Sequence, residues 1–507
     1  MITFAVMMRK MRILVAVAAV LLLAGCGSRS TVPQDGLWYR LTYKGRTSFV
    51  MTHADSALVY SDQTPDTVIF RVKGRKLIIQ TDAGTRRLPL GKITLTPYVE
   101  PDFMPSDYLV YREPCSQVSM TSDLKYGSGT GYWTSLQGVE ADVMKIFTQG
   151  YVKSFRQNLL DLTLDLYRPA GVTEKRPLIL FIHGGAFYVG DKQEPAYVDL
   201  CRHFASLGYV TASMNYRMGF HVGKDDIERA GYMAAQDAHA AMRWLVSKSD
   251  EYGIDPDWLY VAGSSAGSIT ALNMVFMKDA DRPESTRGVR HLLRHLLGSD
   301  DCDLGPVDKA GNDLRTRFQV RAIANMWGAV SSLSLLGNAR TSIISFHGDA
   351  DQVVPFDRGY PFSMAGQAVA KRLSDVMYGS KSIHAEAVRI GLRSEFHPYP
   401  GQGHAFNTSG PDKQPNGIHY DIRDDIVRFF FKERVGEPAA LEDLGGGRYR
   451  VAGDVAAGVQ WKADGGFIVS ADGTAVTVLW RQGEPHRLQS AGRYTAGPGF
   501  LLDTLHE

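Results

Sequence analysis

The sequence predicts an α/β protein with a doubly wound, mostly parallel sheet, flanked by small N- and C-terminal β-rich segments. Two observations lead to this prediction. From about residue 155 to residue 436, apolar strand-like runs alternate with helical patterns, as in parallel sheets with helices on both faces. On either side of that region, short runs rich in β-branched and aromatic residues are separated by Gly, Asp and Pro.

The composition excludes several classes of protein. With 507 residues the chain is long enough for about three domains. A net charge of +2 without a long basic run gives no reason to expect a nucleic-acid partner. The four cysteines show neither a C-x-x-C pair nor metal-ligand spacing, so we expect no disulfide framework and no metal. Cys201 lies on the apolar side of a helical pattern and is predicted to be a buried free thiol.

The N-terminus is typical of a secretory signal. Arg9, Lys10 and Arg12 precede an apolar run at 13–24 that is too short for an ordinary transmembrane helix. The run ends in LAGC at 23–26, which resembles the lipobox of bacterial lipoproteins. The resemblance implies that residues 1–25 are removed and that Cys26 is lipidated; Gly27 at the next position favours the outer membrane. The alternative is an ordinary signal with an accidental cysteine.

Residues 26–120 are interpreted as an N-terminal β module, and residues 437–507 as a C-terminal β segment. We expect strands at 38–43, 57–60, 68–72 and 77–80 in the first, and at 449–451, 459–461, 467–469 and 475–480 in the second. Whether the two form one domain stays open. Residues 121–154 are interpreted as a connector, because the glycine-rich stretch at 127–131 lacks the lysine of a phosphate loop.

Residues 155–436 are expected to form the catalytic domain. The predicted strands are 160–167, 177–182, 209–214, 258–262, 322–326, 342–346 and 394–398. The predicted helices are 198–207, 230–246, 268–277 and 420–431. The stretch between residues 351 and 404 is longer than one helix and leaves room for an insertion or a lid.

The motif GSSAG at 263–267 follows an apolar strand and precedes a helical pattern. A sharp strand-to-helix turn there would project the Ser265 hydroxyl from the sheet, with flanking glycines allowing close backbone approach. A serine needs a histidine to take its proton and a carboxylate to orient that histidine. His404 in GQGHAF and Asp351 in HGDADQVVP both follow strands, at the edge where ligands collect in open α/β sheets.

The oxyanion of an acyl-transfer intermediate needs fixed donors. HGGAF at 183–187 follows the strand 177–182, and its small residues would let backbone N–H groups face that charge. Gly185 and Ala186 are the candidate donors, together with Ala266 directly after the nucleophile.

Residues 155–435 resemble an α/β-hydrolase of the carboxylesterase or lipase type. The resemblance rests on HGGAF, NYR at 215–217, QDA at 236–238, YGIDP at 252–256, GSSAG, HGDADQVVP and GQGHAF. In that family the acid is the aspartate four residues after the histidine of HGxxD, which selects Asp351; Asp349 is the alternative. The resemblance implies a serine esterase that uses an acyl-enzyme and needs no cofactor.

Two other functions stay open. One is a membrane-tethered glycan-binding or adhesion protein on an inactive hydrolase scaffold, and the other is a serine peptidase of the same fold. His291 with His295, and the acidic residues around Asp301, have neither the H-E-x-x-H pattern nor EF-hand spacing, so we expect no metal site at either.

The expected substrate is a short acyl or aromatic acyl ester, with a carbohydrate as a candidate alcohol. Phe187, Tyr188 and Trp327 are expected to line and shorten the pocket. The carbohydrate follows only from the expected setting, an enzyme tethered outside the cytoplasm beside β modules.

Overall fold

The computed structural model divides the chain into two compact units. Unit 2 comprises residues 110–434, and unit 1 comprises residues 1–109 together with 435–507. Residues described by the structure are 37–43, 46–53, 56–60, 65–73, 76–81, 84–89, 94–104, 114, 116–135, 157–221, 223–288, 302–410, 412–495, 497 and 499–506.

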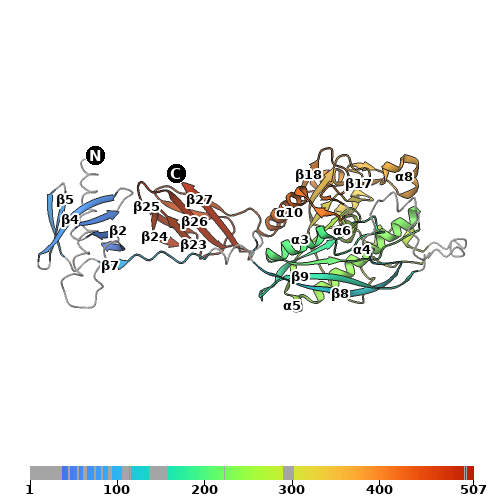
Figure 1. Ribbon diagram of the computed structural model, residues 1–507, viewed down its shortest axis with the longest axis horizontal. Helices are drawn as coiled ribbons and strands as arrows, with labels where there is room; N and C mark the ends of the chain where they lie inside the picture. The colour runs from blue at the N-terminus through green and yellow to red at the C-terminus, as the bar shows by residue number, and fades with distance from the viewer. Residues whose placement is uncertain are drawn as a thin grey trace. The chain divides into compact units, whose positions relative to one another are not determined.

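Unit 2 is built on an eight-stranded sheet with the order β18-β15-β13-β12-β10-β11-β9-β8. Figure 1 labels β8, β9 and β18 of this sheet. The six strands from β18 to β11 are parallel, whereas β9 and β8 run antiparallel to their neighbours. This is the α/β-hydrolase fold, and it confirms the predicted fold class. The strands are β8 (Val118–Gly131), β9 (Asn158–Pro169), β10 (Arg176–Ile182), β11 (Val210–Met214), β12 (Ile254–Ser264), β13 (Val320–Met326), β15 (Ser342–Gly348) and β18 (Ser394–Tyr399).

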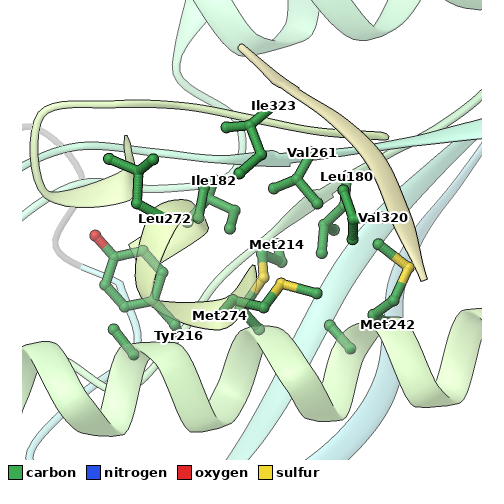
Figure 2. Close-up of a cluster of buried hydrophobic side chains, with 14 of the residues drawn as sticks. Leu180, Ile182, Met214, Tyr216, Met242, Val261, Leu272, Met274, Val320 and Ile323 are labelled. Atoms are coloured by element: carbon green, nitrogen blue, oxygen red, sulfur yellow. The ribbon is translucent and has the colours of Figure 1, made fainter. Parts of the chain in front are cut away.

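Helices cover both faces of this sheet because successive side chains of its buried strands point to opposite sides. Leu180, Ile182 and Val261 face α4 (Lys224–Ser247) and α6 (Ala266–Phe276), which contribute Met242 and Leu272 to the same cluster (Figure 2). A cluster of this kind supplies most of the driving force for folding.

The opposite face of the sheet is covered by α3 (Pro195–Ser206) and α10 (Gly417–Val435). Phe181 of β10 contacts Phe204 of α3, with ring centroids 5.9 Å apart. Tyr260 of β12 stacks on Phe430 of α10 at 4.4 Å. Cys201 of α3 is a buried free thiol, as predicted, and burial raises its pKa.

The parallel register brings five loops to one edge of the sheet. Ile182 pairs with Met214 and Gly263, and Met326 pairs with Ser264 and Phe346. The strands therefore end at nearly the same level, so the segments that follow residues 182, 264, 326, 348 and 399 meet there. This alignment gathers residues that are more than 200 positions apart in the sequence.

The expected connector at 121–154 is wrong for residues 121–131, which belong to β8 and form the edge of the main sheet beside β9. Residues 136–154 of that connector lie outside the described residues. The glycines of β8, which suggested a flexible loop, are instead required by close packing in the strand. A Cβ at Gly127 would lie 2.3 Å from the carbonyl oxygen of Gly311, and one at Gly129 or Gly131 would lie about 3 Å from the Arg217 side chain. Arg217 is buried in a bidentate ion pair with Asp237.

The stretch between β15 and β18 contains α8 (Gln367–Leu373) and α9 (Ser380–Arg389). It also contains β16 (Arg358–Gly359) and β17 (Met377–Gly379), which form a small antiparallel sheet with β14 (Ala329–Val330). The sequence indicated an insertion here, and this small sheet with α8 occupies it.

Unit 1 contains one antiparallel sheet from its N-terminal part and two sheets from its C-terminal part. The seven-stranded sheet has the order β6-β5-β4-β3-β2-β1-β7, and the other two have the orders β21-β22-β25-β24 and β23-β26-β27. The N-terminal strands are β1 (Trp38–Tyr43), β2 (Arg46–His53), β3 (Ser56–Tyr60), β4 (Pro65–Lys73), β5 (Lys76–Thr81), β6 (Gly84–Pro89) and β7 (Thr94–Pro97). The C-terminal strands are β21 (Ala440–Asp443), β22 (Arg448–Ala452), β23 (Gln460–Asp464), β24 (Gly466–Asp472), β25 (Ala475–Trp480), β26 (His486–Arg493) and β27 (Gly499–His506).

The N-terminal sheet and β24 of the C-terminal part pack together inside unit 1. Phe467 of β24 stacks on Phe49 of β2 at 4.4 Å and meets the edge of Trp38 at 4.7 Å. The Arg40 guanidinium donates to the carbonyl of Ile468, and the N–H of Ile468 donates to the Tyr98 hydroxyl. The question left open by the sequence is therefore answered by these contacts: the two β segments share one core.

Candidate active site

Ser265 lies at the sharp turn between β12 and α6. Its backbone has φ 53° and ψ −124°, a conformation that costs energy for a residue with a side chain. A Cβ at Gly263 would lie 2.5 Å from the backbone of Gly267, and one at Gly267 would lie 2.1 Å from the carbonyl oxygen of Ile182. Only glycines fit these two positions, which is why the chain can reverse direction here and present the hydroxyl at the sheet edge.

His404 and Asp351 lie beside Ser265, as the sequence predicted. The Nε2 atom of His404 is 2.8 Å from Ser265 Oγ, and its Nδ1 atom is 2.7 Å from Asp351 Oδ2. His404 comes from the loop after β18, and Asp351 from the loop after β15. Asp349, the alternative acid, instead accepts the N–H of Gly401 at an exposed position. The geometry is that of a nucleophile, a base and an orienting acid.

Asp351 is held as a carboxylate. Burial disfavours its charge, but hydrogen bonds from His347 and His404 outweigh burial and hold its pKa well below the usual range. Its second oxygen, Oδ1, accepts the N–H groups of Val353 at 2.7 Å and Val354 at 3.0 Å. All these partners favour the ionised form, so Asp351 can stabilise a positive charge on His404.

The loop HGGAF follows β10 and turns tightly. Gly185, Ala186 and Phe187 have φ of 105°, 53° and 59°. The carbonyl oxygen of Gly185 accepts the N–H groups of Tyr188 and Val189, and a Cβ at Gly185 would lie 1.8 Å from the carbonyl oxygen of Val189. Gly185 and Ala186 line the same cavity as Ser265.

Ala266 is the first residue of α6. The first N–H groups of a helix have no acceptor within the helix, and they lie at the positive end of its dipole. The three predicted oxyanion donors thus come from the loop beside the nucleophile and from the helix that follows it.

A cavity of about 190 Å3 lies over the triad. Trp327 lines it, as expected, and packs its ring 4.9 Å from Phe406 and 6.5 Å from His404. The indole Nε1 of Trp327 is buried and has no hydrogen-bond partner in the described part of the chain.

Phe187 and Tyr188 do not line this cavity, so that part of the expected pocket is wrong. Phe187 packs against Gly231 and borders a separate cavity of about 110 Å3. Tyr188 contacts the rings of Trp133 and Phe220. The three consecutive positive φ angles turn the chain after Ala186 back towards the core and take both rings with it.

Sequence reasoning missed the polar residues of the cavity. Glu194 and Lys413 both line it and form an ion pair at 3.0 Å. Glu194 lies between the oxyanion loop and α3, and Lys413 lies in the turn between β19 (Thr408–Ser409) and β20 (Gln414–Pro415). The available signal was their position, since each belongs to a segment that follows a predicted strand and a catalytic motif. Asn407 and Thr408 also contribute to the polar lining.

The other candidate sites gain no support. His291, His295, Asp300 and Asp301 lie outside the described residues. Cys302 is exposed, and Asp303 forms an ion pair with Arg282. Over the ranges that the structure describes, no three His, Cys, Asp or Glu side chains are grouped so as to hold a metal ion. Nor does that part of the chain contain a helix long and apolar enough to cross a membrane.

Comparisons with known proteins point to esterases. Residues 164–330 match the family model BD-FAE. The chain is 28% identical over 139 residues to a para-nitrobenzyl esterase from Bacillus subtilis (strain 168), covering 27% of this chain and 28% of the relative. It is 26% identical over 239 residues to a probable isoprenylcysteine alpha-carbonyl methylesterase from Oryza sativa subsp. japonica, covering 43% of this chain and 53% of the relative.

Another relative is gut esterase 1 from Caenorhabditis elegans, 32% identical over 119 residues that cover 22% of this chain and 21% of the relative. Among solved structures, Thermogutta terrifontis esterase 2 phosphorylated by paraoxon is 20% identical with a TM-score of 0.37, covering 61% of this chain and 94% of that one. The chain spans only about a fifth to a half of the length of these curated relatives.

Proposed function

We propose that this chain is a serine carboxylesterase that works through an acyl-enzyme. The observation that carries the proposal is the hydrogen-bonded series Ser265, His404 and Asp351 at the mouth of a cavity. The esterase and lipase relatives support ester hydrolysis in general.

In the first half-reaction, Ser265 Oγ attacks the carbonyl carbon of the ester while His404 Nε2 takes its proton. Asp351 stabilises the imidazolium, and the N–H groups of Gly185, Ala186 and Ala266 hold the oxyanion, each contributing about 3 kcal/mol. The tetrahedral intermediate then releases the alcohol, which leaves with the proton from His404. In the second half-reaction water attacks the acyl-enzyme by the same route, and the carboxylic acid is released.

The decisive experiment is active-site labelling. A fluorophosphonate probe should label the wild-type protein at Ser265, and Ser265→Ala should abolish both labelling and hydrolysis of p-nitrophenyl acetate. Undiminished hydrolysis by Ser265→Ala would refute the proposal. Strict preference for a peptide bond over an ester would assign the site to a peptidase instead.

The substrate proposed is a short or aromatic acyl group on a hydroxyl-rich alcohol such as a carbohydrate. The small cavity volume and the Trp327 ring favour a small or flat acyl group. Glu194 and Lys413 offer an acceptor and a donor to alcohol hydroxyls, and Asn407 and Thr408 add further polar groups. Acetylated and feruloylated polysaccharides, tested beside p-nitrophenyl esters of increasing chain length, would separate an esterase of this kind from a lipase.

Variants of the Glu194–Lys413 pair test whether the site recognises the alcohol part of the ester. Glu194→Gln and Lys413→Met should raise KM for an acetylated sugar by about 10-fold, the effect of losing one hydrogen bond to a charged group. The same variants should change KM for p-nitrophenyl acetate much less, because its alcohol carries no hydroxyl donors. Equal effects on the two substrates would show that the pair does not recognise the alcohol.

The protein is further proposed to be exported and anchored to the bacterial envelope, in the outer membrane, through lipid on Cys26. The support is the LAGC sequence at 23–26 after a basic and apolar leader. Several acyl chains anchor a protein durably, whereas a single chain binds a membrane marginally. Cys26→Ser should therefore move the protein into soluble fractions and stop incorporation of labelled palmitate; retention in the membrane would contradict the anchor.

A further inference from the structure

Asp351 contacts a second histidine that the proposed reaction does not use. His347, at the end of β15, is fully buried, and its Nε2 atom lies 3.3 Å from the same Asp351 oxygen that His404 contacts. The same nitrogen lies 3.3 Å from the carbonyl oxygen of Val354. A carboxylate and a carbonyl only accept hydrogen bonds, so Nε2 must carry a proton to satisfy either of them.

The contacts of His347 Nδ1, on the opposite side of the imidazole ring, independently indicate the same tautomer. The N–H of Gly328 donates to Asn325 Oδ1 at 2.9 Å, which fixes the orientation of the Asn325 amide. Its Nδ2 group therefore donates to Ser380 Oγ at 3.1 Å. With that oxygen accepting from Asn325, the Ser380 proton is free to point at His347 Nδ1, 2.7 Å away. Nδ1 then accepts from Ser380, and a proton on Nε2 completes this pattern of hydrogen bonds.

This series of hydrogen bonds spans the carboxyl ends of neighbouring strands. Asn325 belongs to β13, His347 to β15, and Ser380 is the first residue of α9. The Ser268 hydroxyl on α6, three residues after the nucleophile, also donates to Asn325 Oδ1. Both Asn325 and Ser380 are fully buried, so an unpaired group here would be costly and the orientations are strongly specified.

We propose that His347 is a positioning residue. Held as the Nε2–H tautomer by Ser380 and Asn325, it donates to Asp351 and fixes the carboxylate that orients His404. The proposal rests on the proposed serine mechanism. It assigns to His347 a role different from that of His404, since His347 exchanges no proton with substrate and acts only through Asp351.

Three variants at these positions test the role, with the rate of fluorophosphonate labelling at Ser265 and kcat for p-nitrophenyl acetate as readouts. His347→Leu removes the donor and should lower both by about 10- to 100-fold, the usual effect of losing such a supporting partner, with KM nearly unchanged. His347→Gln keeps an N–H near the Nε2 position and should retain most of the activity. Ser380→Ala lets His347 adopt the other tautomer and should cause an intermediate loss.

A double variant separates tautomer control from packing. A glutamine needs no Ser380 to set its tautomer, so adding Ser380→Ala to His347→Gln should cause no further loss. Additive losses, or equal losses in His347→Gln and His347→Leu, would show that His347 only fills space. Ser345→Ala is the matched control, because Ser345 accepts the other N–H of Asn325 at 2.9 Å but does not lead to His347.

The outcomes also separate this inference from the proposed function. If wild-type protein neither labels nor hydrolyses esters, the serine mechanism itself is refuted. If wild-type protein labels and His347→Leu labels at the same rate, only the positioning role is refuted. Should His347→Leu fail to fold, as judged by its thermal unfolding, the comparison of His347→Gln with and without Ser380→Ala still decides the question.

Discussion

Two aspartates two positions apart differ sharply in their surroundings. Asp351 contacts His404, His347 and two backbone N–H groups, whereas Asp349 accepts one N–H from Gly401 at the surface. Asp351→Asn would leave His404 without its anionic partner and should lower kcat by about 10^4-fold, as expected for loss of the orienting acid. Asp349→Asn should leave kcat within a few-fold. Steady-state rates on p-nitrophenyl acetate distinguish the two, and the reverse ranking would make Asp349 the acid.

The depressed pKa of Asp351 also predicts how stability depends on pH. A carboxyl whose folded-state pKa lies below its unfolded value adds stability that is present above about pH 4 and is lost as the pH falls through the folded value. The difference in unfolding free energy between wild type and Asp351→Asn should therefore be larger at pH 6 than at pH 3. Urea titrations at both pH values measure it, and a difference that grew on acidification would contradict the assignment.

At the residue scale, motifs predicted that Ser265, Asp351 and His404 lie together, because each residue belongs to a motif with a local constraint. Ser265, Asp351 and His404 all follow strands of a parallel sheet, so their convergence follows from the topology. Phe187 shows where this reasoning fails. The sequence shows that Phe187 is the last residue of the loop HGGAF, but it does not show the positive φ values that turn the Phe187 ring into the core. Glu194 and Lys413 meet through a long-range loop contact, which no local pattern encodes.

The turn at Ser265 depends on two glycines that cannot be replaced. Gly263→Ala would place a Cβ 2.5 Å from the backbone of Gly267, where neither side can yield without moving β12 or α6. Overpacking of this kind costs about 1–3 kcal/mol, and here it would also displace Ser265. We expect a lower melting temperature and at least a 100-fold slower labelling of Ser265.

The matched control for this element is Gly337→Ala. Gly337 is exposed, belongs to the short helix Leu333–Asn338, and would have nothing within 4 Å of a new Cβ. This variant should keep wild-type stability and labelling. If both variants behaved alike, the close approach of Gly263 and Gly267 would not be what holds the turn.

Elements with a clear apolar period were predictable, and those without one were not. The buried strands β10 and β11 read as continuous apolar runs and lie within a residue or two of the expected positions. Strand β8 was missed because its glycines remove the alternation of apolar and polar side chains that marks a strand. These glycines are needed there because Gly311 and the Arg217 side chain lie too close for a Cβ. In such an edge strand the tertiary contacts override the local preference.

The core shared by both ends of unit 1 makes a prediction for the whole molecule. Phe467 packs against Phe49, Trp38 and Tyr98, so Phe467→Ala should destabilise unit 1 by about 3–5 kcal/mol, the usual range for a buried phenylalanine. The loss should appear in the N-terminal strands as faster amide exchange of β1 and β2. The rate of fluorophosphonate labelling at Ser265 reports on unit 2 alone, and it should not change. Faster amide exchange confined to β24 would show that the N-terminal and C-terminal strands of unit 1 fold separately.

Phe467 completes the aromatic core of unit 1, and it lies 418 positions after its stacking partner Phe49 in the sequence. Synthesis proceeds from the N-terminus, so the strands around Trp38 and Phe49 are made before their aromatic partner Phe467. A chain cut short anywhere between residues 435 and 466 would contain every residue of the triad but would leave those rings exposed to water. Chaperones and proteases recognise exposed apolar surface of this kind. The core of unit 1 can therefore be completed only after the segment that carries Phe467 has been made.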